Sequence, residues 1–393
     1  MSGEFFKILK NVDVYGPQPM GKKDILVAGE KIASIGDSGA FDAVPEAKAY
    51  DLTGKKAVPG FIDSHAHLLG GGGEGGFQTR TPEAVLSMIT VCGVTTVAGL
   101  LGTDGIARHV ESLLAKAHGL EAEGITTYIY TGAYQLPTPT ITGSVIKDIM
   151  MIDKVIGPGE IAMCDHRSSQ PTLDDYRRLA GEARVGGMLS GKAGVLNIHM
   201  GDSKKGLQYL FSIAEEGEIP RTQFIPTHIN RNEHLFVEGI QWAKDGGFID
   251  VTSGIAPGKT GTAVKPSHAV KRALDAGVPL KNILMSSDGM GSMPIFDEAG
   301  NTIGVGVGDQ SSIFTEFRDM VLNEKIPLEQ AICVITSNVA EALKISKRKG
   351  YIEGGKDADF VIIDEDFAID QVWARGQLMV DKGVAIVKGT FEK

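Results

Sequence analysis

This chain of 393 residues has few cysteines and no long apolar run. Its three cysteines, Cys92, Cys164 and Cys333, are far apart and form no CxxC pair, which argues against a disulfide framework and a thiolate zinc site. No apolar stretch approaches the length of a membrane span, and the N-terminus lacks the basic and apolar regions of a secretory signal. We therefore expect a cytoplasmic protein without a membrane partner.

Positive charge is scarce as well. The formal net charge is -10, whereas binding to a phosphate backbone requires clustered Lys and Arg. The nearest basic run, residues 347–349, is short and typical of a solvated helix end. Hydrophobic residues make up 42% of the chain and charged residues 22%, as in an ordinary globular protein. Nucleic acid is therefore excluded as the main partner, and a sizeable folded core is expected.

The central part of the sequence has the pattern of a parallel α/β protein. Short β-branched runs alternate with longer helical patterns, as in successive βαβ units. Eight such runs match a (β/α)8 barrel of the TIM type. They are residues 57–63, 95–101, 126–132, 160–166, 194–200, 223–229, 248–254 and 282–288. Helices are predicted, among others, at 82–93, 106–124, 268–277, 310–323 and 327–344.

The two ends of the chain differ from this central region. Both contain short strands separated by turn residues, and both lack long helical patterns. We expect segments 1–56 and 346–393 to pair into one small β-domain, a β-sandwich, beside a barrel formed by residues 57–345.

Residues that bind metals recur where the barrel strands should end. His65 and His67 follow the first run, and alternation along an extended segment points both imidazoles to the same side. His199, His228 and Asp288 end the fifth, sixth and eighth runs. Because the carboxyl ends of barrel strands meet at one face, these five side chains are predicted to share a divalent metal site. Imidazole with carboxylate suits zinc, and also iron, manganese or cobalt.

Several longer stretches resemble a known family. They are PGFIDSHAHLLGGGGEGG, GLLGTDGIARHVESLLAKA, TGAYQLPTPTITGSV, DHRS, HMGDSKKGLQ, PTHINRN and SSDGMGS. Over nearly the whole chain the sequence is similar to the isoaspartyl (beta-aspartyl) dipeptidase branch of the amidohydrolase superfamily. The resemblance implies hydrolysis of the β-linked amide of isoaspartyl dipeptides, and it makes a homo-oligomer the expected state.

The same resemblance assigns roles to site residues. It implies a centre of two divalent metal ions, with zinc expected, which activates a hydroxide. The four histidines and Asp288 would be ligands, and Asp288 would also carry the proton to the departing amine. Tyr134 would donate its hydroxyl to the scissile carbonyl.

One position departs from the family pattern. The bridging ligand in related dipeptidases is typically a lysine carboxylated on strand four, but Glu160 stands where that lysine would fall. A carboxylate supplies the same two oxygens and the same single charge, so we predict that Glu160 bridges the two metals. Alternatively, Glu160 only begins strand four and the centre holds one metal. Lys154, the nearest preceding lysine, falls in a helical pattern and is a poor substitute.

One acidic and two basic residues are candidates for substrate contacts. Glu74 lies in the glycine-rich loop 70–76, which lacks the Gly-Lys ending of a phosphate loop. Its carboxylate could accept a substrate ammonium, unless the loop is only a flexible surface segment. Arg167 and Arg231, just past strands four and six, could bind carboxylates or form structural ion pairs. An isoaspartyl dipeptide carries the complementary set of one ammonium and two carboxylates.

Other residues are assigned supporting roles. Thr103 and Ser292 are expected to make secondary contacts with the substrate. Asp165 and His166 are expected to support the metal site by contacting the residues around it and not the metal itself.

Two other functions stay open. A different amidohydrolase reaction, such as cyclic-amide opening or deamination, is favoured by the glutamate bridge but disfavoured by the charges of Glu74, Arg167 and Arg231, which a neutral heterocycle does not need. A non-catalytic barrel that has lost its metals is disfavoured because all four histidines and Asp288 are present.

Overall fold

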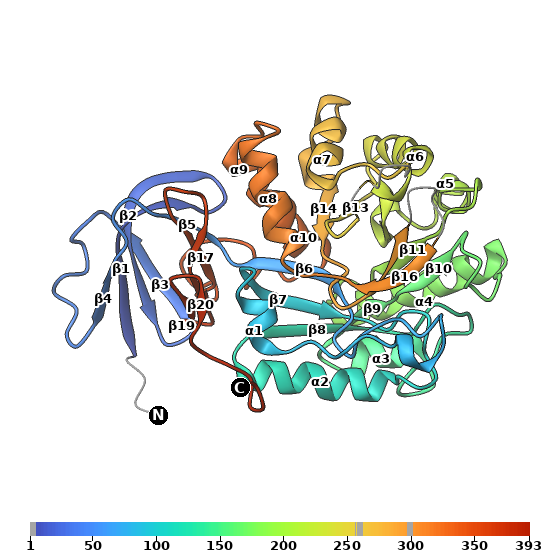
Figure 1. The fold of residues 1–393 in the computed structure, drawn as a ribbon, viewed down its shortest axis with the longest axis horizontal. Helices are drawn as coiled ribbons and strands as arrows, with labels where there is room; N and C mark the ends of the chain where they lie inside the picture. The colour runs from blue at the N-terminus through green and yellow to red at the C-terminus, as the bar shows by residue number, and fades with distance from the viewer. Residues whose placement is uncertain (1–4, 256, 258–261, 297–301) are drawn as a thin grey trace.

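A computed structural model describes residues 5–255, 257, 262–296 and 302–393 of the chain. It has an α/β architecture in which a β-sheet built from both ends of the chain lies beside a larger region of parallel strands and helices (Figure 1). Among the helices of these described ranges, none is long and apolar enough to cross a membrane.

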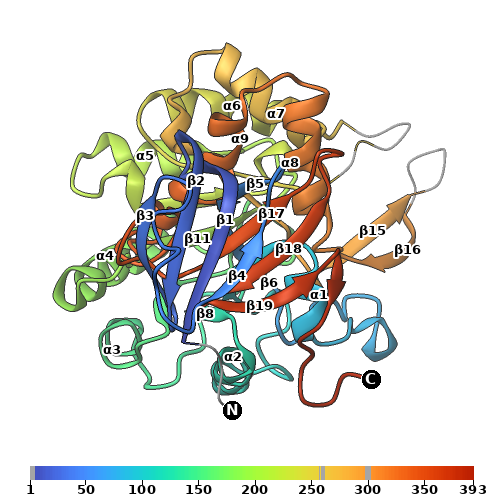
Figure 2. The same cartoon turned by 90° about the vertical axis from the view of Figure 1, so that its left-hand side faces the viewer.

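The two ends of the chain pair with each other in one nine-stranded sheet. Its core strands run in the order β20-β19-β18-β17-β5-β1-β2-β3, with β4 beside β1, and Figure 2 shows the first and last segments side by side. The antiparallel pairing of β5 with β17 joins the two halves. The strands are β1 Phe6–Tyr15, β2 Pro19–Ala28, β3 Lys31–Gly36, β4 Lys48–Asp51, β5 Lys56–Pro59, β17 Phe360–Ile363, β18 Ile369–Ala374, β19 Gln377–Asp381 and β20 Val384–Ala385.

The parallel strands lie at or next to the predicted runs and are buried except at the half-buried Tyr128 of β8, as expected for strands covered on both faces. They are β6 Phe61–Ala66, β7 Val94–Gly99, β8 Thr126–Thr131, β9 Val155–Pro158, β10 Ile161–Met163, β11 Leu196–Met200, β12 Phe224–Thr227, β13 Ile249–Thr252 and β14 Ile283–Ser286. Hydrogen-bonded neighbours are parallel in each of the groups β6–β9, β10–β12 and β13–β14. After β14, the backbone of Asp288 donates to the carbonyl of His65 at 3.0 Å, so the end of β14 lies beside β6.

Helices follow most of these strands. They are α1 Leu86–Thr90, α2 Val110–Glu123, α3 Val145–Met151, α4 Leu173–Ser190, α5 Gln208–Glu215, α6 Glu233–Lys244, α7 Pro266–Asp275, α8 Ser312–Leu322, α9 Leu328–Ile335 and α10 Ser337–Ala342. Short 3-10 helices occur at Phe77–Thr79, Arg221–Gln223, Ile229–Arg231 and Leu280–Asn282. Helix α4 shows why these segments are helical: Thr172 and Asp175 form a capping box, and the buried face includes Tyr176, Leu179 and Ala183.

The structure differs from the sequence prediction at several points along the chain. The run 57–63 is divided at Gly60, where any Cβ would overlap Thr95, so β5 joins the terminal sheet and only β6 joins the parallel strands. The run 160–166 contains only β10, and an unpredicted strand β9 precedes it. The helix predicted at 327–344 is divided into α9 and α10 around Thr336. Lys154 lies in a turn just before β9, so its predicted helical setting is wrong.

The segment after β14 forms an antiparallel hairpin that was not predicted. Its strands are β15 Ser292–Phe296 and β16 Thr302–Val307. The hairpin leads into α8, and its first residue, Ser292, belongs to the site described next.

Candidate metal centre

The predicted metal ligands come from five strand ends and lie together in the interior. His65 is part of β6 and His67 follows it, His199 is part of β11, His228 follows β12, and Asp288 follows β14. Glu160 lies between β9 and β10. Each of the six side chains is buried.

Glu160 occupies the centre of this group. Its Oε1 lies 2.5 Å from His199 Nδ1, 3.2 Å from His228 Nε2 and 3.6 Å from His65 Nε2. Its Oε2 lies 3.7 Å from His67 Nε2. The carboxylate therefore stands between the His65–His67 pair and the His199–His228 pair, which is the position that a bridging ligand requires.

Asp288 faces the first pair of histidines. Its Oδ1 lies 3.1 Å from His67 Nε2 and 3.6 Å from His65 Nε2. Asp288 and His228 both have left-handed backbones, with φ of 55° and 62°. For residues other than glycine this conformation costs about 1–3 kcal/mol, a strain typical of functional positions that the surrounding structure enforces.

Several atoms of the centre are buried without a hydrogen-bond partner among the described residues. They are both ring nitrogens of His65, Nδ1 of His67, Oε2 of Glu160 and Oδ1 of Asp288. Buried polar atoms are normally paired, so such a cluster marks a place for a ligand. Three overlapping groups have ligand atoms within 4.8 Å of one another: His65, His67 and Glu160; His65, His228 and Asp288; and Glu160, His199 and His228. These donors fit a divalent cation.

The ionisation states suit such a ligand. Burial raises the pKa of Glu160, but the imidazoles of His65 and His199 beside it outweigh burial and hold the pKa well below its ordinary value. Burial lowers the pKa of His65, but Glu160 and Asp288 raise it to about 9. Burial lowers the pKa of His228 to about 3 and keeps that ring neutral. In the metal-free protein, the positive charge of protonated His65 offsets the negative charges of Glu160 and Asp288.

Tyr134, which follows β8, lies against the centre. Its hydroxyl is 2.7 Å from His199 Nδ1, and the guanidinium of Arg167 lies over its ring at 5.3 Å. Burial raises the pKa of Tyr134 well above its ordinary value, so the phenol keeps its proton.

The structure brings three of the other predicted substrate residues, Thr103, Arg167 and Ser292, against Glu74. Thr103 Oγ1 donates to Glu74 at 2.9 Å, Ser292 Oγ at 3.3 Å, and Arg167 Nη1 at 3.2 Å. Arg231 meets Arg167 at the same ring nitrogen of His199, with Arg231 Nη1 3.2 Å and Arg167 Nη2 3.0 Å from Nε2, and Arg231 also donates to the Met200 carbonyl. Both arginines also form ion pairs within the protein, Arg167 with Asp165 and Arg231 with Asp202.

Asp165 and His166 were both expected to support the centre, and they differ. Asp165 is buried, with Oδ2 3.1 Å from His199 Nε2. The His166 side chain is 91% exposed and reaches only Asp165, at 3.6 Å. The predicted supporting role of His166 is therefore wrong, because its side chain points into solvent.

Sequence reasoning missed Asp63, which joins β6 to the end of β14. Its Oδ1 accepts hydrogen bonds from the backbone of Ser287 at 3.0 Å and of His65 at 3.3 Å. Its Oδ2 accepts from Ser287 Oγ and from Gln310 Nε2. Asp63 thereby holds the two segments that carry His65 and Asp288 in register. The signal was a lone carboxylate within the apolar run PGFID.

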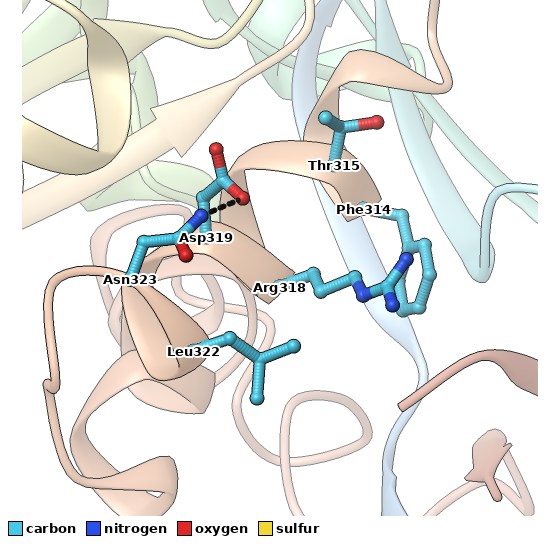
Figure 3. Close-up of a pocket in the computed structure, with 6 residues that line it drawn as sticks. All are labelled: Phe314, Thr315, Arg318, Asp319, Leu322 and Asn323. Atoms are coloured by element: carbon cyan, nitrogen blue, oxygen red, sulfur yellow. Dashed lines mark hydrogen bonds between the residues drawn. The ribbon is translucent and has the colours of Figure 1, made fainter. Parts of the chain in front are cut away.

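One surface hollow adjoins the site, and another lies away from it. A hollow of about 450 Å³ beside Thr103 is lined by the loops that follow β7 and β8, including Ile106 and Gln135. A second hollow, of about 280 Å³, lies on α8 between Phe314 and Asn323, where Asn323 donates to Asp319 (Figure 3). None of the six metal-ligand residues lines either hollow, but the first borders the substrate residues, since Thr103 donates to Glu74.

Comparison with known proteins agrees with this chemistry. The model of the amidohydrolase family matches residues 192–379. The crystal structure of beta-aspartyl dipeptidase from Fervidobacterium islandicum AW-1, solved in complex with the beta-Asp-Leu dipeptide, is 45% identical. It matches over 97% of this chain and 98% of that one, with a TM-score of 0.89.

More distant relatives share less. Dihydroorotase from Lactobacillus leichmannii is 26% identical over 64% of this chain, and the match spans only 59% of the dihydroorotase. Dihydropyrimidinase from Brevibacillus agri NCHU1002 is 16% identical, with a TM-score of 0.68 over 98% of this chain and 96% of that one, and shares the fold, which is of the TIM-barrel type. Amidohydrolases depend on metal, and the centre described above supplies candidate ligands. The chain belongs to the amidohydrolase superfamily and, within it, to the family of the beta-aspartyl dipeptidases.

Proposed function

We propose that this protein is a metal-dependent dipeptidase that hydrolyses the β-linked amide of isoaspartyl dipeptides. The observation that carries the proposal is the position of Glu160 between two pairs of buried histidines, next to the cluster of Glu74 and Arg167. The relative from F. islandicum, solved with beta-Asp-Leu, supports the choice of substrate.

We propose two divalent metal ions, with zinc expected, held by His65, His67, His199, His228 and Asp288 and bridged by Glu160. The donor set and its unpaired atoms support this assignment. Bound there, the ions would activate water near neutral pH and polarise the amide carbonyl.

Asp288 is the proton carrier in this proposal. Its Oδ1 lacks a hydrogen-bond partner among the described residues and faces the centre. Burial raises the pKa of Asp288, but the imidazoles of His65 and His67, which face its Oδ1 at 3.6 and 3.1 Å, lower it well below its ordinary value, so the carboxylate is ionised. It takes the proton from the attacking water and passes it to the amino group that leaves.

Tyr134 stabilises the charge that develops on the carbonyl oxygen. Its hydroxyl is protonated and lies at the inner edge of His199, so it is a preorganised donor. One such donor contributes about 3–4 kcal/mol where water is excluded.

The charged residues around Glu74 select the substrate. Glu74, with Thr103 and Ser292 beside it, accepts the α-ammonium of the aspartyl unit. Arg167 and Arg231 bind the two carboxylates. On binding, substrate carboxylate replaces Glu74 as the partner of Arg167 Nη1, and substrate ammonium replaces Arg167 as the partner of Glu74.

A pair of isomeric substrates tests the proposal. β-Aspartyl-leucine and α-aspartyl-leucine have the same composition and differ in which carboxyl forms the amide. We expect release of free leucine from the β-linked isomer and little from the α-linked one. Equal or exclusive cleavage of α-aspartyl-leucine would refute the proposed specificity.

Four broader assignments are part of the same proposal. The parallel strands close into a (β/α)8 barrel. The terminal strands form a small β-sandwich domain, for which the sequence predicts residues 1–56 and 346–393. Because β5 belongs to the terminal sheet, we extend the first segment of this domain to Gly60. The protein works in the cytoplasm. It assembles as a homo-oligomer, which gel filtration with light scattering would measure.

A further inference from the structure

The two ring nitrogens of His199 face different surroundings. Nδ1 faces the centre, 2.5 Å from Glu160 Oε1, 3.0 Å from His228 Nε2 and 2.7 Å from the Tyr134 hydroxyl. Nε2 faces outward, 3.1 Å from Asp165 Oδ2, 3.0 Å from Arg167 Nη2 and 3.2 Å from Arg231 Nη1.

These surroundings decide where the proton of a neutral His199 lies. A guanidinium has donors and no acceptor, so neither arginine can accept an N–H from His199. The Asp165 carboxylate is the nearest acceptor to Nε2, at 3.1 Å, whereas the Tyr134 hydroxyl lies 3.4 Å from Nε2 and closer to Nδ1, at 2.7 Å. Without Asp165, the two arginines would both donate toward a lone pair on Nε2, and the proton would move to Nδ1. A proton on Nδ1 would occupy the site where a metal needs a lone pair.

Asp165 also holds Arg167. Its Oδ1 accepts from Arg167 Nε at 3.0 Å and from the Arg167 backbone at 2.7 Å, and its Oδ2 accepts from Nη2 at 2.9 Å. This fork fixes the plane of the guanidinium and leaves Nη1 pointing toward Glu74. The same carboxylate therefore contacts a metal-ligand candidate and a substrate-binding candidate.

We infer that Asp165 is a positioning residue that keeps Nδ1 of His199 free for metal and aims Arg167 at the substrate carboxylate. The inference rests on the proposed function. Asp165 is well suited to the role because its buried carboxylate lies against both His199 Nε2 and the Arg167 guanidinium.

The test is Asp165→Asn, which preserves shape but removes the charge and one of the two acceptor oxygens. Metal affinity is measured by competition with a chromophoric zinc chelator, and KM and kcat with β-aspartyl-leucine. We expect metal affinity to fall about 10–100-fold, as for other partners of metal-binding histidines, and KM to rise about tenfold because Arg167 loses its fork. Wild-type metal affinity together with wild-type KM would overturn the inference.

Asp202→Asn is the matched control. Asp202 is also an acidic partner of an arginine, with Oδ1 3.4 Å from Arg231 Nε, but its side chain is 76% exposed and does not contact His199. We expect its metal affinity to match that of the wild type. An equal loss in both variants would show a general charge effect and would contradict the specific role of Asp165.

A crystal structure of the metal-loaded wild-type protein tests the same point even if the variant does not fold. We expect metal at His199 Nδ1 and a hydrogen bond from Nε2 to Asp165. Metal bound through Nε2 would overturn the inference while leaving the proposed function intact. A wild-type protein that binds metal but does not cleave β-aspartyl-leucine would instead refute the proposed function.

Discussion

The site has a metal half and a substrate half, which differ in whether their polar groups have hydrogen-bond partners. The metal half comprises His65, His67, Glu160, His199, His228 and Asp288, and the substrate half comprises Glu74, Thr103, Arg167, Arg231 and Ser292. His65, Glu160 and Asp288 have buried atoms without a hydrogen-bond partner among the described residues. Glu74 and Arg167 are bonded to each other and to their neighbours. The metal half therefore offers buried ligand atoms that a cation would pair, whereas the substrate half is already satisfied and must exchange partners when substrate binds.

Within the metal half, we expect the largest effect from a substitution of Asp288. Its Oδ1 has no hydrogen-bond partner among the described residues, and the proposed mechanism assigns the proton transfer to it. Asp288→Asn keeps the size of the side chain but cannot carry the proton, so we expect kcat for β-aspartyl-leucine to fall about 10³-fold. Metal content is measured in the same preparation, because a loss of metal would lower kcat by another route. A variant with full metal content and wild-type kcat would contradict the role of Asp288.

The pairing of charges in the metal half predicts a pH dependence of stability for the metal-free protein. The pKa of His65 is about 9 in the folded chain, above the ordinary value of 6.5. A pKa that is raised in the folded state stabilises the fold below pH 6.5, and this contribution is lost as pH rises through 9. The difference corresponds to about 3 kcal/mol.

Urea unfolding of chelator-treated protein at pH 6.5 and 9.5 measures this loss. His65→Gln, which cannot be protonated, is the control and should show a flatter pH profile. Metal-free wild-type protein that gains stability between these pH values would show that His65 is not the compensating charge.

In the substrate half we expect a smaller effect. Glu74→Gln keeps hydrogen bonding but removes the charge for the α-ammonium, so KM for β-aspartyl-leucine should rise about tenfold with little change in kcat. Succinyl-leucine, which has the same amide and carboxylates but no ammonium, sharpens the test. If Glu74→Gln affects both compounds equally, Glu74 does not bind the ammonium.

Much of this site could be predicted because the ligands follow apolar strands. His199 and His228 end runs of β-branched and apolar residues, and the carboxyl ends of parallel strands meet at one face. Glu160 was identified only from its distance to the DHRS motif, since no periodic pattern marks it.

What could not be predicted depends on contacts between distant segments. The division of the first run at Gly60 follows from packing against Thr95, and the clamp of Asp63 depends on Ser287 and Gln310, more than 200 residues away. The pairing of Arg167 with Asp165 is close in sequence, yet its geometry depends on where His199 lies. Such contacts leave no periodic signal in the sequence.

The most direct test of the account is the metal content of the purified protein and of Glu160→Gln. Elemental analysis of dialysed wild-type protein should find about two divalent ions per chain, since Glu160 lies between two pairs of histidines. The variant should hold fewer, because an amide supplies one weak oxygen ligand in place of two charged ones. Glu316→Gln, which alters a buried glutamate on α8, is the control and should keep the full content. Unchanged stoichiometry in Glu160→Gln would contradict the bridge on which the account depends.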